Sequence, residues 1–146
     1  MKLTVIQVPG AFTPGCQARH VTPYIENIND LAAKGVDLVV VIASNDSFVM
    51  AAWGKVNGMY LIASCVTLCT ELITYCLGVD GNSKIKFMSD SKTMFSKQIG
   101  WMAGVGDRNG RYAMVIEKDG TISYAERETS PREVSVSLQE LLSSCL

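Results

Sequence analysis

The sequence carries little charge of either sign and no cluster of basic residues. Its 146 residues include 13 Lys and Arg against 14 Asp and Glu, which leaves a net charge of −1. Proteins that bind nucleic acids or membrane surfaces usually present a basic patch or stripe. The charge pattern therefore predicts that neither a nucleic acid nor a membrane is a partner of this protein.

Signals for metal binding and for secretion are also missing. The chain has 1 His, and its 5 Cys form no CxxC pair and no Cys/His pair at metal-ligand spacing, so we expect no zinc site, no thioredoxin-type dithiol and no bound cofactor. The opening residues, MKLTVIQVPG, lack the long apolar core and the cleavage site of a secretory signal. This predicts an intracellular, reducing compartment, in which the cysteines are thiols.

Alternating strand and helix patterns predict an α/β fold. Runs of β-branched residues indicate strands at 3–8, 36–43 and 84–88, and an Asp-Gly turn indicates a hairpin formed by 112–117 and 121–125. Apolar residues at helical spacing, together with capping residues and glycine stops, indicate helices at 17–34, 47–55, 90–99 and 134–143. This order predicts a single domain over residues 1–146, with a mixed sheet and helices on both faces.

The candidate site lies in the segment between the first strand and the first helix, PGAFTPGC at residues 9–16. It places Cys16 in the first turn of a helix, where free N–H groups and the helix dipole stabilise a thiolate. Pro14 suits the start of a helix, and Thr13 either caps that helix or points its hydroxyl at an oxygen that approaches the sulfur. The alternative interpretation is a small buried cysteine with no chemistry.

These residues resemble a known family. Pro9, Thr13 and Cys16 match the PxxxTxxC motif of peroxiredoxins, and the string VPGAFTPGCQARHVTPYIE is similar to their atypical type II branch, in particular to fungal enzymes of the peroxisomal type. The blocks AAKGVDLVVVIASNDSFVMAAWGK, FMSDSKTMFSKQIGW and GRYAMVIEKDGTISYA resemble family blocks in the same order. The resemblance implies a thioredoxin-like fold and a thiol-dependent peroxidase.

The resemblance also assigns roles to four residues. Cys16 would be the peroxidatic cysteine, which attacks a hydroperoxide and becomes a sulfenic acid. Thr13 would orient the peroxide, and Pro9 would shield the sulfur from water. Arg111 would hold Cys16 as a thiolate and polarise the O–O bond. The alternative for Arg111 is an exposed cation at the end of a strand, and the resemblance makes that alternative less favoured.

His20 and an aromatic block at residues 48–53 each allow two interpretations. His20 follows Cys16 by four residues and so shares a helix face with it, which suggests a nucleophile and base pair. We favour packing or hydrogen bonding near the loop instead. Phe48, Met50 and Trp53 lie in a block that resembles one abutting the active-site loop and contributing to a homodimer interface in the family, although plain core packing explains them equally well.

The chain departs from the family pattern at its N-terminus. Family members usually carry a hairpin and a helix before the strand that leads into PGAFTP, and their absence would expose a sheet edge. In fungal relatives that region can hold the resolving cysteine, so the resemblance identifies none here. Cys145 is a candidate resolving residue only because it is a cysteine near the end of the chain. A one-cysteine cycle that uses an external thiol is the expectation.

A second departure is an apolar insertion at residues 59–78, which holds 14 apolar residues in 20, three cysteines and a single charge, Glu71. A membrane-spanning helix would suit this length, but Glu71 and the sheet strands that follow argue against it. A lid is a second alternative. We favour a retained intron translated in frame, because Gly58-Met59-Tyr60 and Leu77-Gly78 can be encoded by a splice donor and an acceptor. Its removal restores the uninterrupted family sequence, and sequencing the transcript would test it.

We therefore predict a peroxidase that reduces hydrogen peroxide and alkyl hydroperoxides through Cys16, with thioredoxin, glutaredoxin or glutathione as the thiol reductant. The competing hypothesis is an inactive, truncated relative that acts only in binding or as a structural remnant. The cytoplasm is the expected compartment. The peroxisome is the alternative, because Ser144-Cys145-Leu146 keeps the first and last residues of a Ser-Lys-Leu signal.

Overall fold

The computed structural model of this chain describes residues 1–58, 84–130, 134 and 138–144. The predicted insertion at 59–78, Cys145 and residues 135–137 of the predicted last helix lie outside the described residues. Among the described residues, no helix is both long and apolar enough to cross a membrane.

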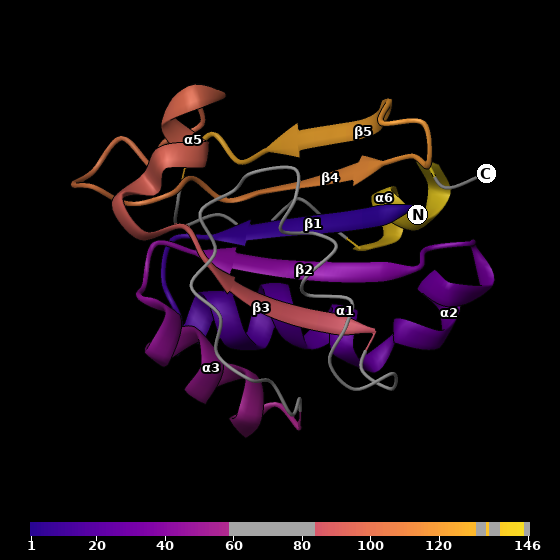
Figure 1. Cartoon of the computed structure of the whole chain (residues 1–146), viewed down its shortest axis with the longest axis horizontal. Helices are drawn as coiled ribbons and strands as arrows, with labels where there is room; N and C mark the ends of the chain where they lie inside the picture. Colours follow the sequence, from indigo (N-terminus) through magenta and orange to yellow (C-terminus); the bar gives the residue numbers. More distant parts are fainter. Residues whose placement is uncertain (59–83, 131–133, 135–137, 145–146) are drawn as a thin grey trace.

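The predicted strands form one mixed sheet, with the order β3-β2-β1-β4-β5 (Figure 1). The five strands are β1 (Leu3–Val8), β2 (Leu38–Ala43), β3 (Ile85–Ser89), β4 (Tyr112–Ile116) and β5 (Ile122–Arg127). Strands β1, β2 and β3 are parallel, whereas β4 is antiparallel to both β1 and β5. The carboxyl ends of three parallel strands and the start of β4 therefore meet at one edge of the sheet.

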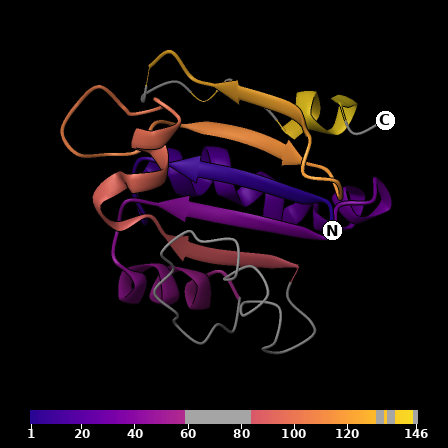
Figure 2. The same cartoon turned by 45° about the horizontal axis from the view of Figure 1, so that its top comes forward.

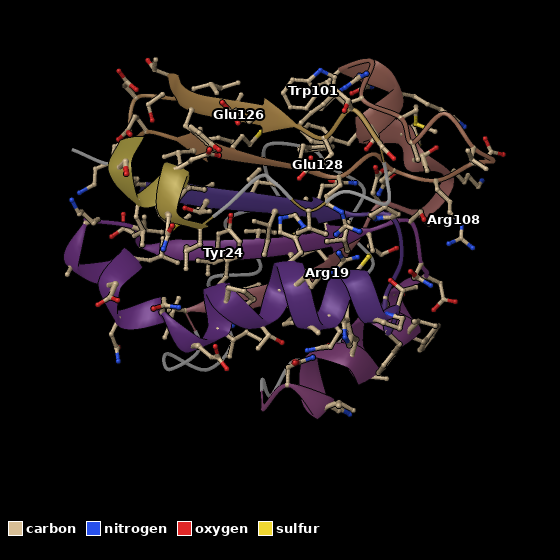
Figure 3. The ribbon with its side chains drawn as sticks, turned by 180° about the vertical axis from the view of Figure 1, so that it is seen from behind. Arg19, Tyr24, Trp101, Arg108, Glu126 and Glu128 are labelled. Atoms are coloured by element: carbon tan, nitrogen blue, oxygen red, sulfur yellow. The ribbon has the colours of Figure 1, made fainter. Side chains whose placement is uncertain are left out.

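Most helices cover the same face of the sheet. They are η1 (Gly15–Val21), which is a π-helical turn, α1 (Thr22–Glu26), α2 (Ile28–Ala33), α3 (Ser47–Val56) and α6 (Leu138–Ser144). Figure 3, which views the molecule from behind, shows α1 in front of the sheet. The larger apolar core lies between these helices and the sheet, and includes Ile6, Val41, Leu31, Trp53 and Leu141. Burial of this face supplies the main driving force for folding.

The opposite face carries a smaller cluster and, in the part of the chain that the structure describes, a single short helix. This is α5 (Met94–Gln98), preceded by the turn η2 (Ser91–Thr93). Figures 1 and 2 both show α5 at the end of the sheet to which the arrowheads of β1, β2 and β3 point. Phe95 and Trp101 pack against the strand residues of this face. The prediction of helices on both faces is confirmed, with an uneven distribution.

The first predicted helix is interrupted, which corrects the expectation of one helix over 17–34. At Asn27 the backbone leaves the helical region, with φ −105° and ψ 23°, and separates α1 from α2. The Asn27 side chain donates a hydrogen bond to the carbonyl of Pro23 at 2.8 Å. An asparagine that bonds locally to the backbone in this way competes with helix continuation, and apolar periodicity alone does not reveal it.

The predicted helix over 90–99 begins later than expected. Lys92 and Thr93 adopt left-handed conformations, with φ of 68° and 55°, so the chain turns sharply before α5 starts. The carboxylate of Asp90 then accepts hydrogen bonds from the backbone N–H groups of Phe95 at 3.1 Å and Ser96 at 3.3 Å. Asp90 therefore caps this helix across the turn rather than as its adjacent residue.

Asp90 also belongs to a buried group of polar side chains that we call the Tyr112 cluster, formed by Gln7, Asp90, Ser96 and Tyr112. The Tyr112 hydroxyl donates to Oε1 of Gln7 at 2.8 Å and lies 3.3 Å from Oγ of Ser96. Nε2 of Gln7 donates to Oγ of Ser96 at 3.1 Å. Burial raises the pKa of Tyr112, so its hydroxyl stays neutral. The cluster ties β1, β4 and α5 together.

Candidate active site

The loop between β1 and η1 is fastened to the segment that follows β2. The backbone N–H of Ala11 donates to Oδ1 of Asn45 at 2.7 Å, and Oγ of Ser44 donates to the carbonyl of Pro9 at 3.2 Å. The Asn45 carbonyl in turn accepts from Oγ of Ser89 at 2.6 Å. Because β1, β2 and β3 end at the same edge, the residues that follow β2 and the last residue of β3 hold this loop in place.

Thr13 closes the loop from within. Its hydroxyl donates to the carbonyl of Gly10 at 3.0 Å, while its own carbonyl accepts from the backbone N–H of Gln17 at 2.8 Å. No side chain caps η1, so the predicted capping alternative for Thr13 is wrong. A hydroxyl that donates to Gly10 keeps its oxygen lone pairs available for a hydrogen bond from another molecule.

Contacts with α3, one of them aromatic, also hold the loop between β1 and η1. Phe12 has a left-handed backbone with φ 59°, and its half-exposed ring lies 6.0 Å from that of the fully buried Trp53, centroid to centroid. The indole N–H of Trp53 donates to Oε1 of Gln17, and Nε2 of Gln17 donates to Oδ1 of Asn57 at 2.7 Å. Helix α3 therefore holds both the loop and the first turn of the following helix.

Cys16 and Arg111 meet beneath this loop, although 95 positions separate them in the sequence. Nη2 of Arg111 donates to Sγ of Cys16 at 3.5 Å. Both residues are buried, with exposed fractions of 2% for Cys16 and 3% for Arg111. A guanidinium that donates to a sulfur atom favours the negatively charged form of that sulfur, and burial strengthens the interaction because water screens it less.

His20 contacts the arginine rather than the cysteine. Its Nδ1 lies 3.2 Å from Nη1 of Arg111. Because arginine only donates hydrogen bonds, Nδ1 is the acceptor and the proton of the neutral ring is on Nε2. Burial, and secondly the charge of Arg111, lower the pKa of His20 from 6.5 to about 3. The expectation that His20 packs and hydrogen-bonds near the loop is confirmed.

Gly110 places Arg111 at the start of β4. The backbone N–H of Gly110 donates to the carbonyl of Trp101 at 2.9 Å. A Cβ atom at Gly110 would lie 2.6 Å from that same carbonyl oxygen, closer than atoms can approach without a shift of the backbone. A glycine is therefore required here, and the Trp101 segment fixes the chain immediately before Arg111.

A pocket of about 730 Å³ opens above the sulfur. Its lining brings together the four residues with a predicted catalytic role and adds others from η1 and the 101–110 loop. The lining residues are Pro9, Thr13, Gly15, Cys16, Arg19, Ala103, Val105, Gly106, Arg108 and Arg111. Figure 3 labels Arg19, on the helix in front of the sheet, and Arg108, at one end of the molecule. Within the described residues no cluster of His, Cys, Asp and Glu is suited to hold a metal ion.

Other predicted residues are placed as follows. Met50 and Trp53 are buried in the core, which confirms the packing interpretation for these two, whereas Phe48 is 79% exposed and its role in a homodimer stays a prediction. Cys145 and the three cysteines of the insertion lie outside the described residues.

Sequence reasoning did not identify Asn45, Gln17 and Gly110 as parts of this site. Asn45 stands beside Asp46, and it is Asp46 whose side chain caps α3 by accepting from the backbone N–H of Val49 at 2.9 Å. The signal for Asn45 was its position directly after a buried parallel strand, where loops of neighbouring strands converge. Gln17 and Gly110 act through contacts distant in sequence, which no local pattern contains.

Comparison with known proteins gives consistent matches. Residues 1–141 match the family described as Redoxin. The chain is 46% identical to Peroxiredoxin AHP1 of Chaetomium thermophilum, covering 86% of this chain and 59% of that protein. It is 41% identical to Peroxiredoxin Pen c 3 of Penicillium citrinum, covering 93% of this chain and 68% of that protein. The structure of reduced Prx3 from Vibrio vulnificus in complex with hydrogen peroxide is similar, with TM-score 0.75, 30% identity, and coverage of 99% of this chain and 79% of that one.

Proposed function

Because this chain belongs to the Redoxin family and is a peroxiredoxin, we propose that Cys16 is its peroxidatic cysteine and that the chain reduces hydrogen peroxide and alkyl hydroperoxides. The family resemblance and the thioredoxin-like fold expected from the sequence are confirmed. The assignment of individual residues rests on their positions in the pocket. Pro9, Thr13 and Arg111 line that pocket together with Cys16.

The hydrogen bond from Arg111 to Cys16 is the observation that carries this proposal. A nucleophilic cysteine must be a thiolate, and a cationic donor 3.5 Å from the sulfur stabilises that form. An inactive relative has no need to hold Arg111 against Cys16, so this contact supports the peroxidase over the inactive alternative. Cys16 also lines an open pocket, which supports access of a small peroxide to this residue.

In the proposed reaction, the thiolate of Cys16 attacks the terminal oxygen of the hydroperoxide. An S–O bond forms, the O–O bond breaks, and the sulfur is oxidised by two electrons to a sulfenic acid. The remaining oxygen leaves as an alkoxide, or as hydroxide from hydrogen peroxide, and takes a proton from water. Arg111 and the Thr13 hydroxyl are placed to hydrogen-bond the two peroxide oxygens, which stabilises charge as it moves onto the leaving oxygen.

Pro9 has a passive role in this proposal. It lines the pocket beside the sulfur and has no N–H group, so it limits the water that can solvate the thiolate without competing for the peroxide. Two molecules of an external thiol then reduce the sulfenic acid, which yields a disulfide and water and restores Cys16. Thioredoxin, glutaredoxin and glutathione are the proposed classes of reductant. Cys145 remains an alternative resolving residue.

Peroxide consumption by the whole chain tests the proposal. With dithiothreitol in excess, the wild-type chain should consume hydrogen peroxide catalytically, and Cys16→Ser should reduce the rate to the background of the thiol alone. Cys145→Ser is the matched control, and in a one-cysteine cycle it retains the wild-type rate. Equal rates for the wild type and Cys16→Ser would refute the role of Cys16.

The compartment needs a separate test. The cytoplasm is the proposed location and the peroxisome is the alternative. A fluorescent protein fused to the N-terminus leaves Ser144-Cys145-Leu146 available to a targeting receptor. Diffuse fluorescence would support the cytoplasm, whereas punctate fluorescence that coincides with a peroxisomal marker would support the alternative.

A further inference from the structure

The pocket above Cys16 is larger than hydrogen peroxide requires. A water molecule occupies about 30 Å³ in the liquid, and hydrogen peroxide is only slightly larger, whereas the pocket volume is about 730 Å³. Part of its wall is apolar, formed by Pro9, Ala103 and Val105. Val105 is 71% exposed, so its side chain is open to a molecule that enters the pocket. The remaining volume can hold the organic group of a larger hydroperoxide.

The rest of the rim is cationic. Arg19 and Arg108 line the pocket with Arg111, and none of the lining residues that the structure describes is acidic. Nη1 of Arg108 lies 3.5 Å from the position that a Cβ of Gly10 would occupy, and Nη2 of Arg19 lies 3.2 Å from the corresponding position at Gly15. The two guanidinium groups therefore lie against opposite ends of the Cys16 loop, and Figure 3 shows the residues that carry them.

Arg108 is the rim arginine best suited to bind an incoming anion. Asp107, the nearest acidic residue in sequence, pairs with Lys97 at 3.4 Å instead of with Arg108. No salt bridge joins Arg108 to an acidic residue in the described ranges, and its carbonyl fixes the loop by accepting from Ala103 at 3.0 Å. By contrast, Arg111 is engaged with Cys16 and His20, and Arg19 has other interactions.

We propose that this pocket selects hydroperoxides that carry a carboxylate, and that Arg108 binds the carboxylate while Cys16 attacks the peroxide. The inference rests on the proposed function of Cys16 and adds its substrate class. The planar guanidinium of arginine matches a carboxylate with two parallel hydrogen bonds, so it orients the substrate as well as attracting it. The apolar wall at Val105 and Ala103 contacts the carbon skeleton between the two polar ends.

A hydroperoxide that carries a carboxylate would react with Cys16 by the same steps as hydrogen peroxide. The Cys16 thiolate and the hydroperoxide give a Cys16 sulfenic acid and an alkoxide, which takes a proton from water to become an alcohol. The carboxylate is unchanged by the reaction and remains bound to Arg108 until the product leaves. An external dithiol then reduces the sulfenic acid to the thiol and water, and is itself oxidised to a disulfide.

A pair of substrates that differ by one carboxylate group tests the proposal. Cumene hydroperoxide and its para-carboxylate analogue are compared with dithiothreitol in excess, and kcat/KM is measured for each. The wild-type chain should prefer the carboxylate, and Arg108→Gln should lower the ratio of the two kcat/KM values by about fivefold, the value expected for one partly exposed ion pair. Arg108→Lys keeps the charge and should retain most of the ratio. Added salt should reduce the wild-type ratio.

Lys118→Gln is the matched control, because it removes one exposed positive charge from the β4–β5 turn, at the opposite edge of the sheet. It should keep the wild-type ratio. An equal ratio in the wild type and Arg108→Gln, or an equal fall in Lys118→Gln, would overturn the role of Arg108 while leaving the proposed peroxidase intact. Failure of the wild type to consume either peroxide faster than Cys16→Ser would refute the proposed function and this inference together.

Discussion

Arg111 and Tyr112 are neighbours in sequence, yet their side chains enter opposite faces of the sheet and join two different polar groups. Arg111 contacts Cys16 and His20 on the helical face, and we call these three residues the Cys16 cluster. Tyr112 contacts Gln7 and Ser96 on the other face, within the Tyr112 cluster. Both groups are buried, and both join β4 to elements distant in sequence.

The two clusters differ in whether any of their polar groups also faces a pocket. In the Tyr112 cluster, the hydroxyl, amide and carboxylate groups bind one another and the N-terminus of α5, so the result is a structural link. In the Cys16 cluster, Sγ receives a hydrogen bond from Arg111, and Cys16 and Arg111 both line a pocket. A buried polar cluster is a candidate for chemistry where its members also line a pocket.

Replacement of Arg111 should have the largest effect. Arg111→Met removes the donor to Cys16, and loss of one such donor typically costs about 100-fold to 1000-fold in rate. We expect kcat/KM for hydrogen peroxide to fall by that factor in steady-state assays. Arg127→Met is the matched control, because Arg127 is an exposed arginine on β5 that donates to the carbonyl of Gly100 at 3.1 Å. A loss of equal size in both variants would mean that Arg111 acts only through the net charge of the protein and not through its hydrogen bond to Cys16.

The Cys16 cluster should also make stability depend on pH. His20 stays neutral in the folded state because its pKa is lowered to about 3, whereas in the unfolded chain it takes up a proton below about 6.5. Protonation thus favours the unfolded state as the pH falls through this window, by about 2 kcal/mol at pH 5. Urea unfolding at pH 7.5 and 5.0 measures the change. His20→Asn keeps an acceptor for Arg111 but does not titrate. Its unfolding free energy should therefore fall less between pH 7.5 and 5.0, by about 2 kcal/mol.

An equal fall in the wild type and His20→Asn would contradict the conclusion that His20 is buried and neutral in the folded state.

Tyr112→Phe should have the smallest effect, and it should lower stability rather than activity. It removes the hydroxyl that donates to Gln7 and leaves a buried acceptor without its partner, which costs about 1 to 2 kcal/mol of unfolding free energy. Urea unfolding should show this loss, while kcat/KM stays within about twofold of the wild type because the sulfur and its donor are untouched. Tyr124→Phe, on β5, is the control for removal of a hydroxyl outside the cluster. A large loss of activity in Tyr112→Phe would erase the distinction between the two clusters.

The sequence predicted the strands well because their signals are local. The β-branched runs at β1 and β2 and the Asp-Gly turn between β4 and β5 each specify a strand or a hairpin within a few residues. Helix boundaries were less accurate at Asn27 and near Asp90. There, side-chain hydrogen bonds to the backbone and two left-handed residues override apolar periodicity, and both effects depend on atomic positions.

The site was predictable to the extent that its residues lie in a recognisable motif. Pro9, Thr13 and Cys16 occur within eight residues, and the resemblance added Arg111 from a distant block. The supporting residues were not predictable. The hydrogen bond of Asn45 to Ala11, the close approach of Gly110 to Trp101, and the position of Arg108 at the rim result from the folding of separate loops onto one sheet edge.

Of the 5 cysteines in the chain, Cys16 should be the one whose sulfur peroxide oxidises. Treatment of the reduced chain with one equivalent of hydrogen peroxide in the presence of dimedone, followed by peptide mass spectrometry, locates the sulfenic acid directly. We expect the dimedone adduct on the peptide that contains Cys16, and its loss in Cys16→Ser. An adduct mainly on another cysteine, or none in the wild-type chain, would contradict the role of Cys16 as the peroxidatic residue.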